Sequence, residues 1–314
     1  MINKLLVYLT HPHVDTWNFK PRHKEILQAE IPGLEVTVCY HLAEFLERLP
    51  ETEAVAVWYF KKEWLVKAPR LKLITTPAAG TDWIDATPAK NLQIFHGGFH
   101  GWMIAESVTG AIFYFCKAFP LSSAMQSQAK WAPKKISDCL RSLYAARVTI
   151  LGFGRIGTTI GKALKPFGCT LTGVKQIATP PPEYFSQEDR VVTVDQLSEV
   201  LRTTDHLILV LPGGADTQGI FTRKHFRILP ASSYVYNVGR GNVYKEEDLV
   251  DALSKGEIAG AYLDVFEKEP LSAESALWKM DNVLLQPHIS AASPQYMELF
   301  VRELAGRINI NEVG

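Results

Sequence analysis

The segment from Val148 to Lys175 constrains the fold of this chain more than any other part of the sequence. A short, mostly β-branched run, Val148 to Leu151, predicts a buried strand that leads directly into Gly152-Phe153-Gly154-Arg155-Ile156-Gly157. A helical pattern starts in that loop and lasts to about Phe167, and Thr170 to Val174 predicts a second strand. A G-x-G-x-x-G loop between a strand and a helix is the pattern of a dinucleotide-binding βαβ unit.

Each residue of this loop has a distinct physical use. Gly152 permits the tight turn, Gly154 lets the backbone approach a pyrophosphate, and Gly157 allows the helix to pack closely on the strand. Arg155 and Ile156 open the helix, whose first N–H groups and partial positive charge favour phosphate. All five residues are therefore predicted to bind a nucleotide cofactor, against the alternative of an accidental glycine turn.

Lys175 occupies the end of the second strand, where an acidic residue commonly binds the ribose 2′-hydroxyl of NAD. The chain has no Asp or Glu between Asp138 and Glu183. A lysine would suit a 2′-phosphate, so we expect NADPH to be preferred over NADH. The alternative is that Lys175 is a solvated strand end.

Length and composition indicate an ordinary globular protein with two cores. The chain has 314 residues, of which 47% are hydrophobic and 21% charged. Lys plus Arg and Asp plus Glu both number 33, so no nucleic-acid or membrane partner is expected. The four cysteines are scattered, which favours reduced thiols in a cytoplasmic protein, without disulfides or a metal site.

The first hundred residues alternate strand-like and helix-like segments, which predicts a parallel sheet with helices on both faces. The expected strands are Lys4–Thr10, Glu35–Tyr40, Ala54–Phe60, Leu71–Pro77 and Leu92–His96, and the expected helices Lys20–Glu30 and Leu42–Leu49. The loop after the fourth strand contains Ala79 and Gly80, whose backbone either holds a carboxylate or forms a plain tight turn.

Gly101 to Phe119 predicts a long apolar helix, and Ser122 to Tyr144 is expected to be irregular. That irregular stretch is either an arm packing on a second subunit or a surface excursion. Beyond the Gly-rich unit the alternation resumes, and Pro294 to Ile310 predicts an amphipathic helix that returns to the first domain.

Three ionisable residues follow predicted strands in the second half of the chain. Arg240 lies in Asn-Val-Gly-Arg-Gly, Glu269 in Asp-Val-Phe-Glu-Lys-Glu-Pro, and His288 in Gln-Pro-His-Ile. Carboxyl ends of parallel strands share one edge, so these residues are expected beside the Gly-rich loop. Singly each suits an ordinary surface or loop role; together they favour a catalytic site.

With these motifs, the chain resembles the D-isomer-specific 2-hydroxyacid dehydrogenases over nearly its whole length. The resemblance implies two doubly wound parallel-sheet domains, with a Rossmann cofactor domain inserted in a flavodoxin-like substrate domain. The implied boundaries are residues 1–98 and 289–314 for the substrate domain and 99–288 for the NAD(P)-binding domain. It also implies a homodimer.

The resemblance further implies roles for single residues. Arg240 would bind the carboxylate and polarise the carbonyl of a 2-oxo acid, because its planar guanidinium matches a carboxylate. His288 would be the general acid, and Glu269 would hydrogen-bond its second nitrogen and favour the imidazolium. Cofactor contacts are implied for Asp264, at the nicotinamide carboxamide, and for Leu211, Pro212, Thr217 and Val238, around the nucleotide.

Two aromatic residues are expected near the substrate. His100 stands where the family often has asparagine, and is either a substrate contact or structural. Trp58, which ends a strand, either walls the substrate pocket or belongs to the core. Glu269 argues against formate oxidation, because formate-oxidising relatives carry glutamine there.

The expected function is reduction of a small 2-oxo acid, such as glyoxylate or hydroxypyruvate, by NADPH, with NADH possible. The alternative is a nucleotide-sensing binding protein, similar to the corepressors that share this fold.

Overall fold

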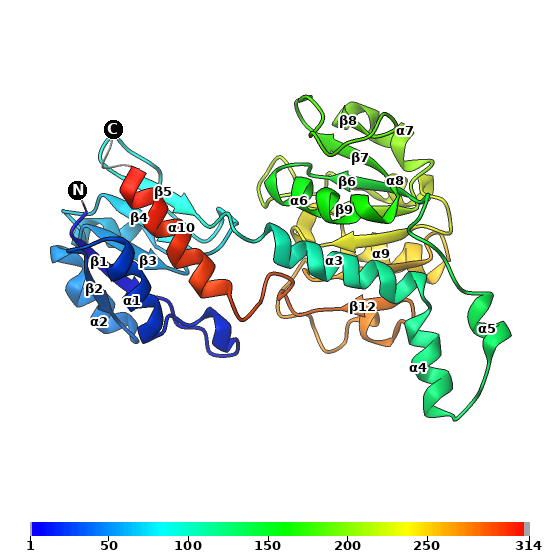
Figure 1. Cartoon of the computed structure of the whole chain (residues 1–314), viewed down its shortest axis with the longest axis horizontal. Helices are drawn as coiled ribbons and strands as arrows, with labels where there is room; N and C mark the ends of the chain where they lie inside the picture. Colours follow the sequence, from blue (N-terminus) through cyan, green and yellow to red (C-terminus); the bar gives the residue numbers. More distant parts are fainter. Residues whose placement is uncertain (1, 311–314) are drawn as a thin grey trace. The chain divides into compact units, whose positions relative to one another are not determined.

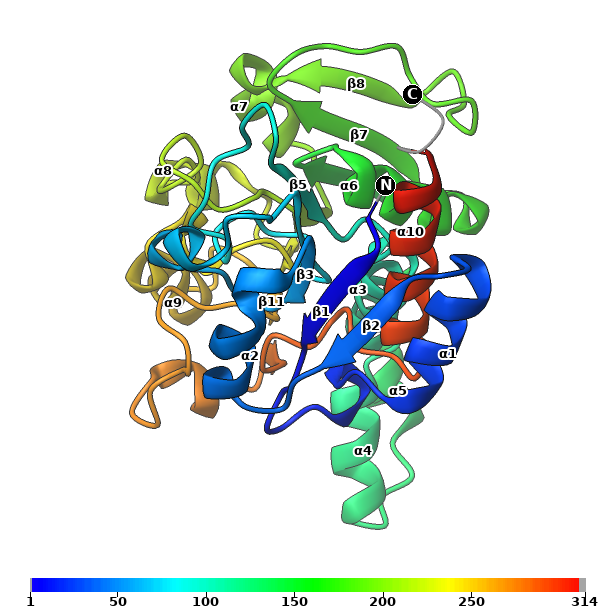
Figure 2. The same ribbon diagram turned by 90° about the vertical axis from the view of Figure 1, so that its left-hand side faces the viewer.

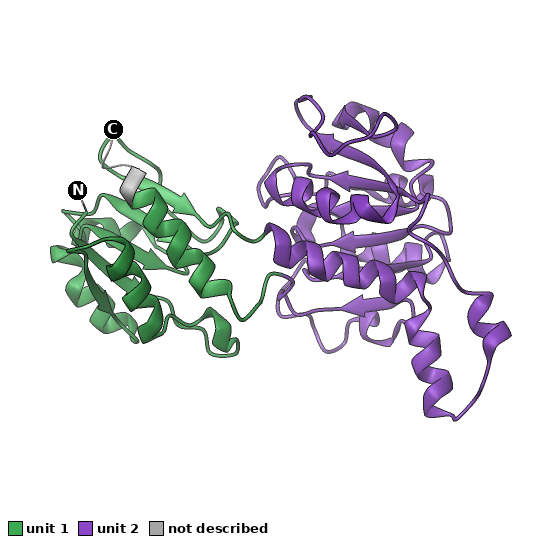
Figure 3. Ribbon diagram, in the orientation of Figure 1, with its two compact units in different colours: residues 1–100, 291–314 green, residues 101–290 purple. Residues whose placement is uncertain are grey.

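The computed structural model describes residues 2–310, which divide into two compact units (Figures 1 and 3). Unit 1 comprises residues 1–100 and 291–314, and unit 2 comprises residues 101–290. Both boundaries lie two residues beyond the expected ones. Residues 1 and 311–314, which the expected substrate domain includes, lie outside the described part of the chain.

Unit 1 is built on a parallel sheet with the strand order β2-β1-β3-β4-β5. This is the flavodoxin-like order, in which the chain reverses direction across the sheet after β2. Its strands, all at predicted positions, are β1 Lys4–Tyr8, β2 Glu35–Val38, β3 Ala54–Val57, β4 Leu73–Thr76 and β5 Gln93–His96.

Alternation along the strands of unit 1 sends neighbouring side chains to opposite faces of the sheet. Leu5 and Val7 share one cluster with Leu27 of α1 (Pro21–Glu30) and Phe300 of α10 (Tyr296–Ile310). Leu6 joins the opposite cluster, which includes residues of α2 (Leu42–Arg48). Figure 2 shows α1 and α10 together on one side of this sheet. The amphipathic C-terminal helix is thus a structural part of unit 1, as predicted.

Unit 2 is built on a larger parallel sheet with the order β12-β11-β10-β9-β6-β7-β8. Counted from β6, this is the Rossmann arrangement with one additional strand at its edge. The strands are β6 Arg147–Leu151, β7 Thr170–Lys175, β8 Arg190–Thr193, β9 His206–Leu209, β10 Tyr234–Asn237, β11 Gly260–Leu263 and β12 Val283–Leu285. The predicted fold class is therefore confirmed.

Helices cover both faces of the unit 2 sheet. One face buries residues of α7, α8 and α9 against the strands, and α3 packs beside α6 (Figure 1). The helices are α3 Gly101–Cys116, α4 Phe119–Ser127, α5 Pro133–Ser137, α6 Arg155–Leu164, α7 Leu197–Leu201, α8 Arg223–Ile228 and α9 Glu246–Ser254. In the described residues no helix is long and apolar enough to cross a bilayer.

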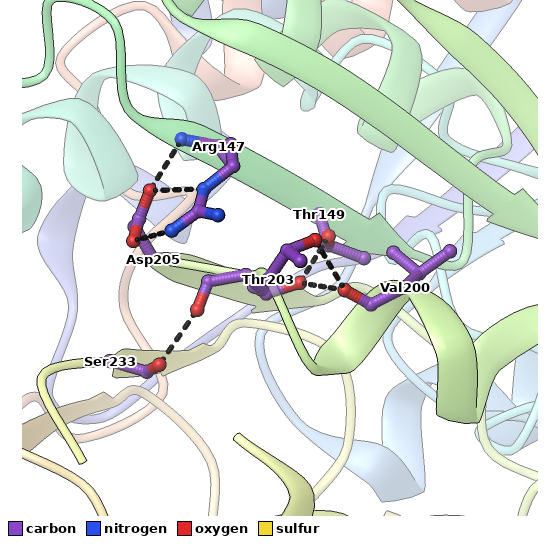
Figure 4. A network of polar contacts seen from close by, with 7 residues as sticks. Arg147, Thr149, Val200, Thr203, Asp205 and Ser233 are labelled. Atoms are coloured by element: carbon purple, nitrogen blue, oxygen red, sulfur yellow. Dashed lines mark hydrogen bonds and ion pairs between the residues drawn. The ribbon is translucent and has the colours of Figure 1, made fainter. Parts of the chain in front are cut away.

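A polar network ties together the amino ends of three strands of unit 2 (Figure 4). Asp205, before β9, accepts hydrogen bonds from the backbone N, Nε and a terminal guanidinium nitrogen of Arg147, at 2.8, 3.0 and 2.9 Å. The Ser233 hydroxyl donates to the Thr204 carbonyl oxygen at 2.7 Å. Since ligands of such folds bind at the carboxyl ends, this network has a structural role.

The expectation that residues 122–144 are irregular is wrong. The predicted long helix ends at Cys116, and α4 and α5 follow within the segment that was expected to lack helices. Both new helices carry a proline in their first turn, Pro120 and Pro133, where its missing N–H costs nothing. A proline that indicates a break in a pattern is here a helix start.

Candidate functional site

The Gly-rich loop has the geometry that a pyrophosphate requires. Gly152 has a φ of +97°, and a Cβ there would lie 2.5 Å from the Val210 carbonyl oxygen. A Cβ on Gly157 would lie 2.6 Å from the Gly152 oxygen, so the helix packs against the turn only with glycine. Gly154, just before α6, has open space where its Cβ would be. The loop and the start of α6 therefore fit a dinucleotide phosphate.

Other predicted cofactor residues lie on the same carboxyl edge of the sheet. Lys175 ends β7, beside β6, and its Nζ donates to Thr179 Oγ1 at 3.2 Å. The loop after β9 is closed by Thr217, whose hydroxyl donates to the Pro212 carbonyl oxygen at 2.7 Å. A Cβ on Gly239, next to Val238, would lie 2.6 Å from the Leu211 carbonyl oxygen. The loop after β10 therefore packs tightly against the loop after β9.

The loops after β11 and β12 bring Glu269 and His288 together. His288 Nδ1 lies 2.7 Å from Glu269 Oε2, and Glu269 Oε1 accepts a hydrogen bond from the Phe266 backbone N at 3.0 Å. Both carboxylate oxygens are thus engaged. The His288 side chain is 37% exposed, so the ring remains accessible to a reactant.

Glu269 is held in its ionised form. Burial raises its pKa, but the hydrogen bond and charge of His288, the Phe266 N–H and the nearby Arg240 outweigh burial and place the pKa below its ordinary value. A carboxylate on Nδ1 fixes the ring orientation and leaves Nε2 as the atom that holds the transferable proton.

Asp264 positions the backbone on which His288 is carried. Its buried carboxylate accepts hydrogen bonds from the backbone N of Ile289 and Ser290 at 2.8 and 3.0 Å, and its own carbonyl oxygen accepts from His288 N at 2.8 Å. His288 has a φ of +56°, a left-handed conformation that is unusual outside glycine. The three backbone hydrogen bonds hold the chain in this conformation.

Arg240 is positioned by a buried asparagine. Asn237, at the end of β10, donates from Nδ2 to the Arg240 carbonyl oxygen at 3.0 Å and accepts from Gly239 N at 3.1 Å. A guanidinium nitrogen of Arg240 donates to the Gly239 carbonyl oxygen at 2.9 Å. The charge of Arg240 is the smallest of the effects that lower the pKa of Glu269.

Within unit 1, the predicted substrate residues gather around Tyr296, at the start of α10. The Tyr296 hydroxyl lies 3.1 Å from His100 Nε2 and donates to the Pro77 carbonyl oxygen at 3.3 Å, at the start of the loop that contains Ala79 and Gly80. The ring of Trp58 lies 6.2 Å from that of Tyr296, centroid to centroid. Trp58, Pro77 and His100 follow the carboxyl ends of β3, β4 and β5, respectively.

Residues 109–290 match the family model described as "D-isomer specific 2-hydroxyacid dehydrogenase, NAD binding domain". That match covers more than half of the chain. The chain belongs to this family.

Solved members of the family have the same fold. A D-isomer specific 2-hydroxyacid dehydrogenase from Xanthobacter autotrophicus, in complex with NADPH and MES, is 26% identical with a TM-score of 0.81, covering 99% of this chain and 96% of that one. An NADPH-dependent glyoxylate/hydroxypyruvate reductase from Sinorhizobium meliloti, in complex with NADP and sulfate, is 26% identical with a TM-score of 0.80, covering 98% and 96%.

Among curated relatives, glyoxylate/hydroxypyruvate reductase A of an Enterobacter species is 33% identical over 193 residues, which are 62% of this chain and 59% of that protein. The first curated relatives are matched over only part of their length, from 53% to 66%.

Some residues and contacts at the carboxyl edges of the two sheets were not predicted from the sequence. Asn237 and Asp264 lie in motifs that the sequence analysis used. Their hydrogen-bond partners, such as Ser290 N for Asp264, depend on how three loops fold and were not predicted. Trp17 and Tyr296 stand 279 positions apart, yet their rings lie 5.8 Å apart. The sequence predicted Tyr296 only as part of the helix Pro294–Ile310, and nothing in the local pattern indicates its ring contacts.

Proposed function

We propose that this protein reduces small 2-oxo acids, of the glyoxylate or hydroxypyruvate kind, to the D-2-hydroxy acids with a reduced nicotinamide cofactor. The observation that carries the proposal is the 2.7 Å contact between His288 Nδ1 and Glu269, on the sheet edge that also bears Arg240 and the Gly-rich loop. The names of the similar reductases support the same substrate class.

The residues of unit 2 account for the chemistry of such a reduction. A reduced nicotinamide, when bound at the Gly-rich loop, supplies the hydride. Arg240 binds the carboxylate of the acid and polarises its carbonyl group, because the guanidinium offers two parallel N–H donors. His288 holds a proton at Nε2 and gives it to the carbonyl oxygen, which becomes the hydroxyl, while Glu269 stabilises the ring in its charged form.

A panel of 2-oxo acids tests the proposal. Glyoxylate, hydroxypyruvate and 2-oxobutyrate are each mixed with NADPH or NADH, and the absorbance of the reduced nicotinamide is followed. Turnover of at least one acid is expected. Absence of turnover with every acid, in a protein that still binds the nucleotide, would favour the nucleotide-sensing alternative.

For the cofactor, we propose that NADPH is preferred because Lys175 lies where the ribose 2′-group of the nucleotide would be recognised. We expect kcat/KM with NADPH to exceed that with NADH by about tenfold or more. In Lys175→Ser, kcat/KM with NADPH should fall while that with NADH stays nearly constant. A clear preference for NADH in the unchanged protein would overturn this assignment.

A homodimer is our proposal for the assembly, with α4 and α5 packing on a second copy. Both helices stand away from the sheet of unit 2 in Figure 1. Trp131, between them, is 96% exposed, and Phe119 and Tyr144 are also exposed. Exposed aromatic residues in one segment suit an interface. Light scattering should give twice the chain mass, and Trp131→Asp should reduce it.

The cytoplasmic location stays a proposal as well. Cys39, Cys116 and Cys169 are buried and carry no disulfide, which suits a reducing compartment. A thiol titration of the unfolded, freshly purified protein should find all four cysteines reduced.

A further inference from the structure

The segment of unit 2 that carries Glu269 has no regular structure of its own. Residues 264–275, between β11 and the 3₁₀ helix Ala276–Lys279, contain neither helix nor strand. Phe266 is buried in this segment, whereas residues 267–270 are exposed. The hydrophobic core therefore fixes the start of the segment, and the position of Glu269 depends on polar contacts.

Glu246, the first residue of α9, contacts this segment on both sides of Glu269. Its backbone N donates a hydrogen bond to Glu267 Oε2 at 3.1 Å. Its Oε1 accepts a hydrogen bond from the Ser275 hydroxyl at 3.3 Å. One residue thus closes the loop that carries the partner of His288.

The contact with Glu267 serves as the missing cap of α9. The N-cap residue Lys245 makes no side-chain capping hydrogen bond, because a lysine side chain has no acceptor for the free N–H groups of the first turn. The carboxylate of Glu267 supplies that acceptor and also suits the positive end of the helix. Leu249 and Leu253 bury α9 in the core of unit 2, so the loop is attached to a fixed helix.

The same loop is in backbone contact with the loop that carries Arg240. A Cβ on the next residue, Gly241, would lie 1.9 Å from the carbonyl carbon of Phe266 and 2.4 Å from the backbone N of Glu267. Only glycine permits this approach. The peptide between Phe266 and Glu267 therefore sets where Glu269 lies relative to Arg240.

The oxygen atoms of Glu246 matter here more than its charge. Burial raises the pKa of Glu246, and the nearby Glu267 carboxylate acts in the same direction. Hydrogen bonds from the Ser275 hydroxyl and the Glu267 backbone N–H offset these effects only in part. Because the site disfavours the ionised form, a neutral side chain with an acceptor oxygen should serve the loop equally well.

We propose that Glu246 is a positioning residue, which holds the loop of residues 264–275 so that Glu269 meets His288 Nδ1. Glu246 acts through Glu269 and needs no contact with a reactant. This inference rests on the proposed reduction of 2-oxo acids and adds a residue to the three that carry out its chemistry.

Two variants of Glu246 and one control test the proposal. Glu246→Ala removes the acceptor of the Ser275 hydroxyl and should lower kcat with glyoxylate by about fivefold, which corresponds to one ordinary hydrogen bond. Glu246→Gln keeps an acceptor oxygen and should stay within about twofold of the unchanged protein. The matched control is Glu247→Ala, which removes the same charge from the same turn, where exposed Glu247 lies 3.7 Å from Lys245. An unchanged kcat in Glu246→Ala would overturn the proposal.

A double variant distinguishes positioning from a general loss of structure. When Glu269→Ala is already present, Glu246→Ala should lower kcat by less than about twofold further, because the positioned carboxylate is gone. NADPH binding, followed by its fluorescence, should stay the same in both backgrounds. A full fivefold further loss would mean that Glu246 does not act through Glu269. Should Glu246→Ala not fold, Glu267→Ala removes the other contact and is expected to lower kcat in the same way.

Hydrogen exchange of residues 264–275 provides a readout that needs no turnover. Exchange should be faster in Glu246→Ala than in the unchanged protein and in Glu247→Ala. Equal exchange in all three would overturn the role of Glu246 in holding the loop. Faster exchange in a protein that reduces no 2-oxo acid would instead overturn the proposed function, so the two failures are distinguishable.

Discussion

The carboxyl edges of the two sheets carry different chemistry. On unit 2, the side chains of Glu269, His288 and Asp264 are bonded to one another or to backbone groups. On unit 1, the edge is aromatic, and the indole N–H groups of Trp17 and Trp58 lack acceptors among the described residues. The catalytic side chains proposed on unit 2 are therefore held by the protein itself, whereas the two indole donors of unit 1 are not.

The difference follows from what each edge has to do. A proton donor must be oriented and ionised before the substrate arrives, so its hydrogen bonds have to come from the protein. A recognition site gains selectivity when its donors are satisfied only by the correct ligand. We therefore expect changes on unit 2 to lower turnover with every acid, and changes on unit 1 to alter the choice between acids.

The largest effect is expected for His288→Gln. Glutamine removes the transferable proton while retaining polarity, so kcat should fall by between about 10² and 10⁴-fold with every acid. Binding of NADPH, measured by the change in its fluorescence, should be unaffected. Near-normal kcat in this variant would refute the assignment of His288 as general acid and with it the contrast between the edges.

Glu269→Gln should have the next largest effect. The lowered pKa of Glu269 keeps this carboxylate ionised throughout the neutral range, and glutamine removes that negative charge from His288 Nδ1. The ring then lacks its hydrogen-bonded carboxylate, so turnover should fall by about 100-fold. Steady-state kcat measures this loss, and a kcat within about twofold of that of the unchanged protein would contradict a role of Glu269 in the proton transfer.

Variants of Asp264 distinguish a role in positioning the His288 backbone from a role in binding the cofactor. In Asp264→Ala the backbone N–H groups of Ile289 and Ser290 lose their acceptor, which should cost about 2–4 kcal/mol of stability and about tenfold in kcat. Asp264→Asn retains an acceptor oxygen and should lose less of both. Thermal unfolding and steady-state kinetics provide the readouts. If both variants instead raise KM for NADPH alone, the cofactor contact implied by the family resemblance is the dominant role.

Local sequence patterns were sufficient to predict much of the structure of unit 2. Strand, glycine loop and helix follow one another within about 28 residues, and Gly152 and Gly157 need no distant partner to be recognised. Arg240, Glu269 and His288 were singled out because each follows a predicted strand in a short, distinctive motif. The contact between Glu269 and His288 follows from parallel strands that share one edge.

The aromatic edge of unit 1 was less predictable, because it depends on packing between distant segments. Trp58 was predicted to be a wall of the substrate pocket or a core residue, and His100 a substrate contact or a structural residue. Trp17 lies in a short 3₁₀ helix after β1, and Tyr296 opens a helix from the far end of the chain. No periodicity indicates that these rings meet. The α4–α5 segment was also missed, because residues 122–144 were expected to be irregular.

The smallest effect is expected for the pH dependence of the preference for hydroxypyruvate over 2-oxobutyrate. Burial and His13 lower the pKa of His11, and its Nδ1 accepts hydrogen bonds from two backbone N–H groups, so both effects favour the neutral ring. We therefore expect the donors of the aromatic cluster formed by His11, Trp17 and Trp58 to change little in the neutral pH range. Dividing kcat/KM for hydroxypyruvate by that for 2-oxobutyrate cancels any ionisation on unit 2 that both acids share. This ratio should therefore change by less than about twofold, although kcat/KM for each acid varies with pH. A ratio that follows a histidine titration would mean that unit 1 also handles charge, and the contrast between the two edges would be lost.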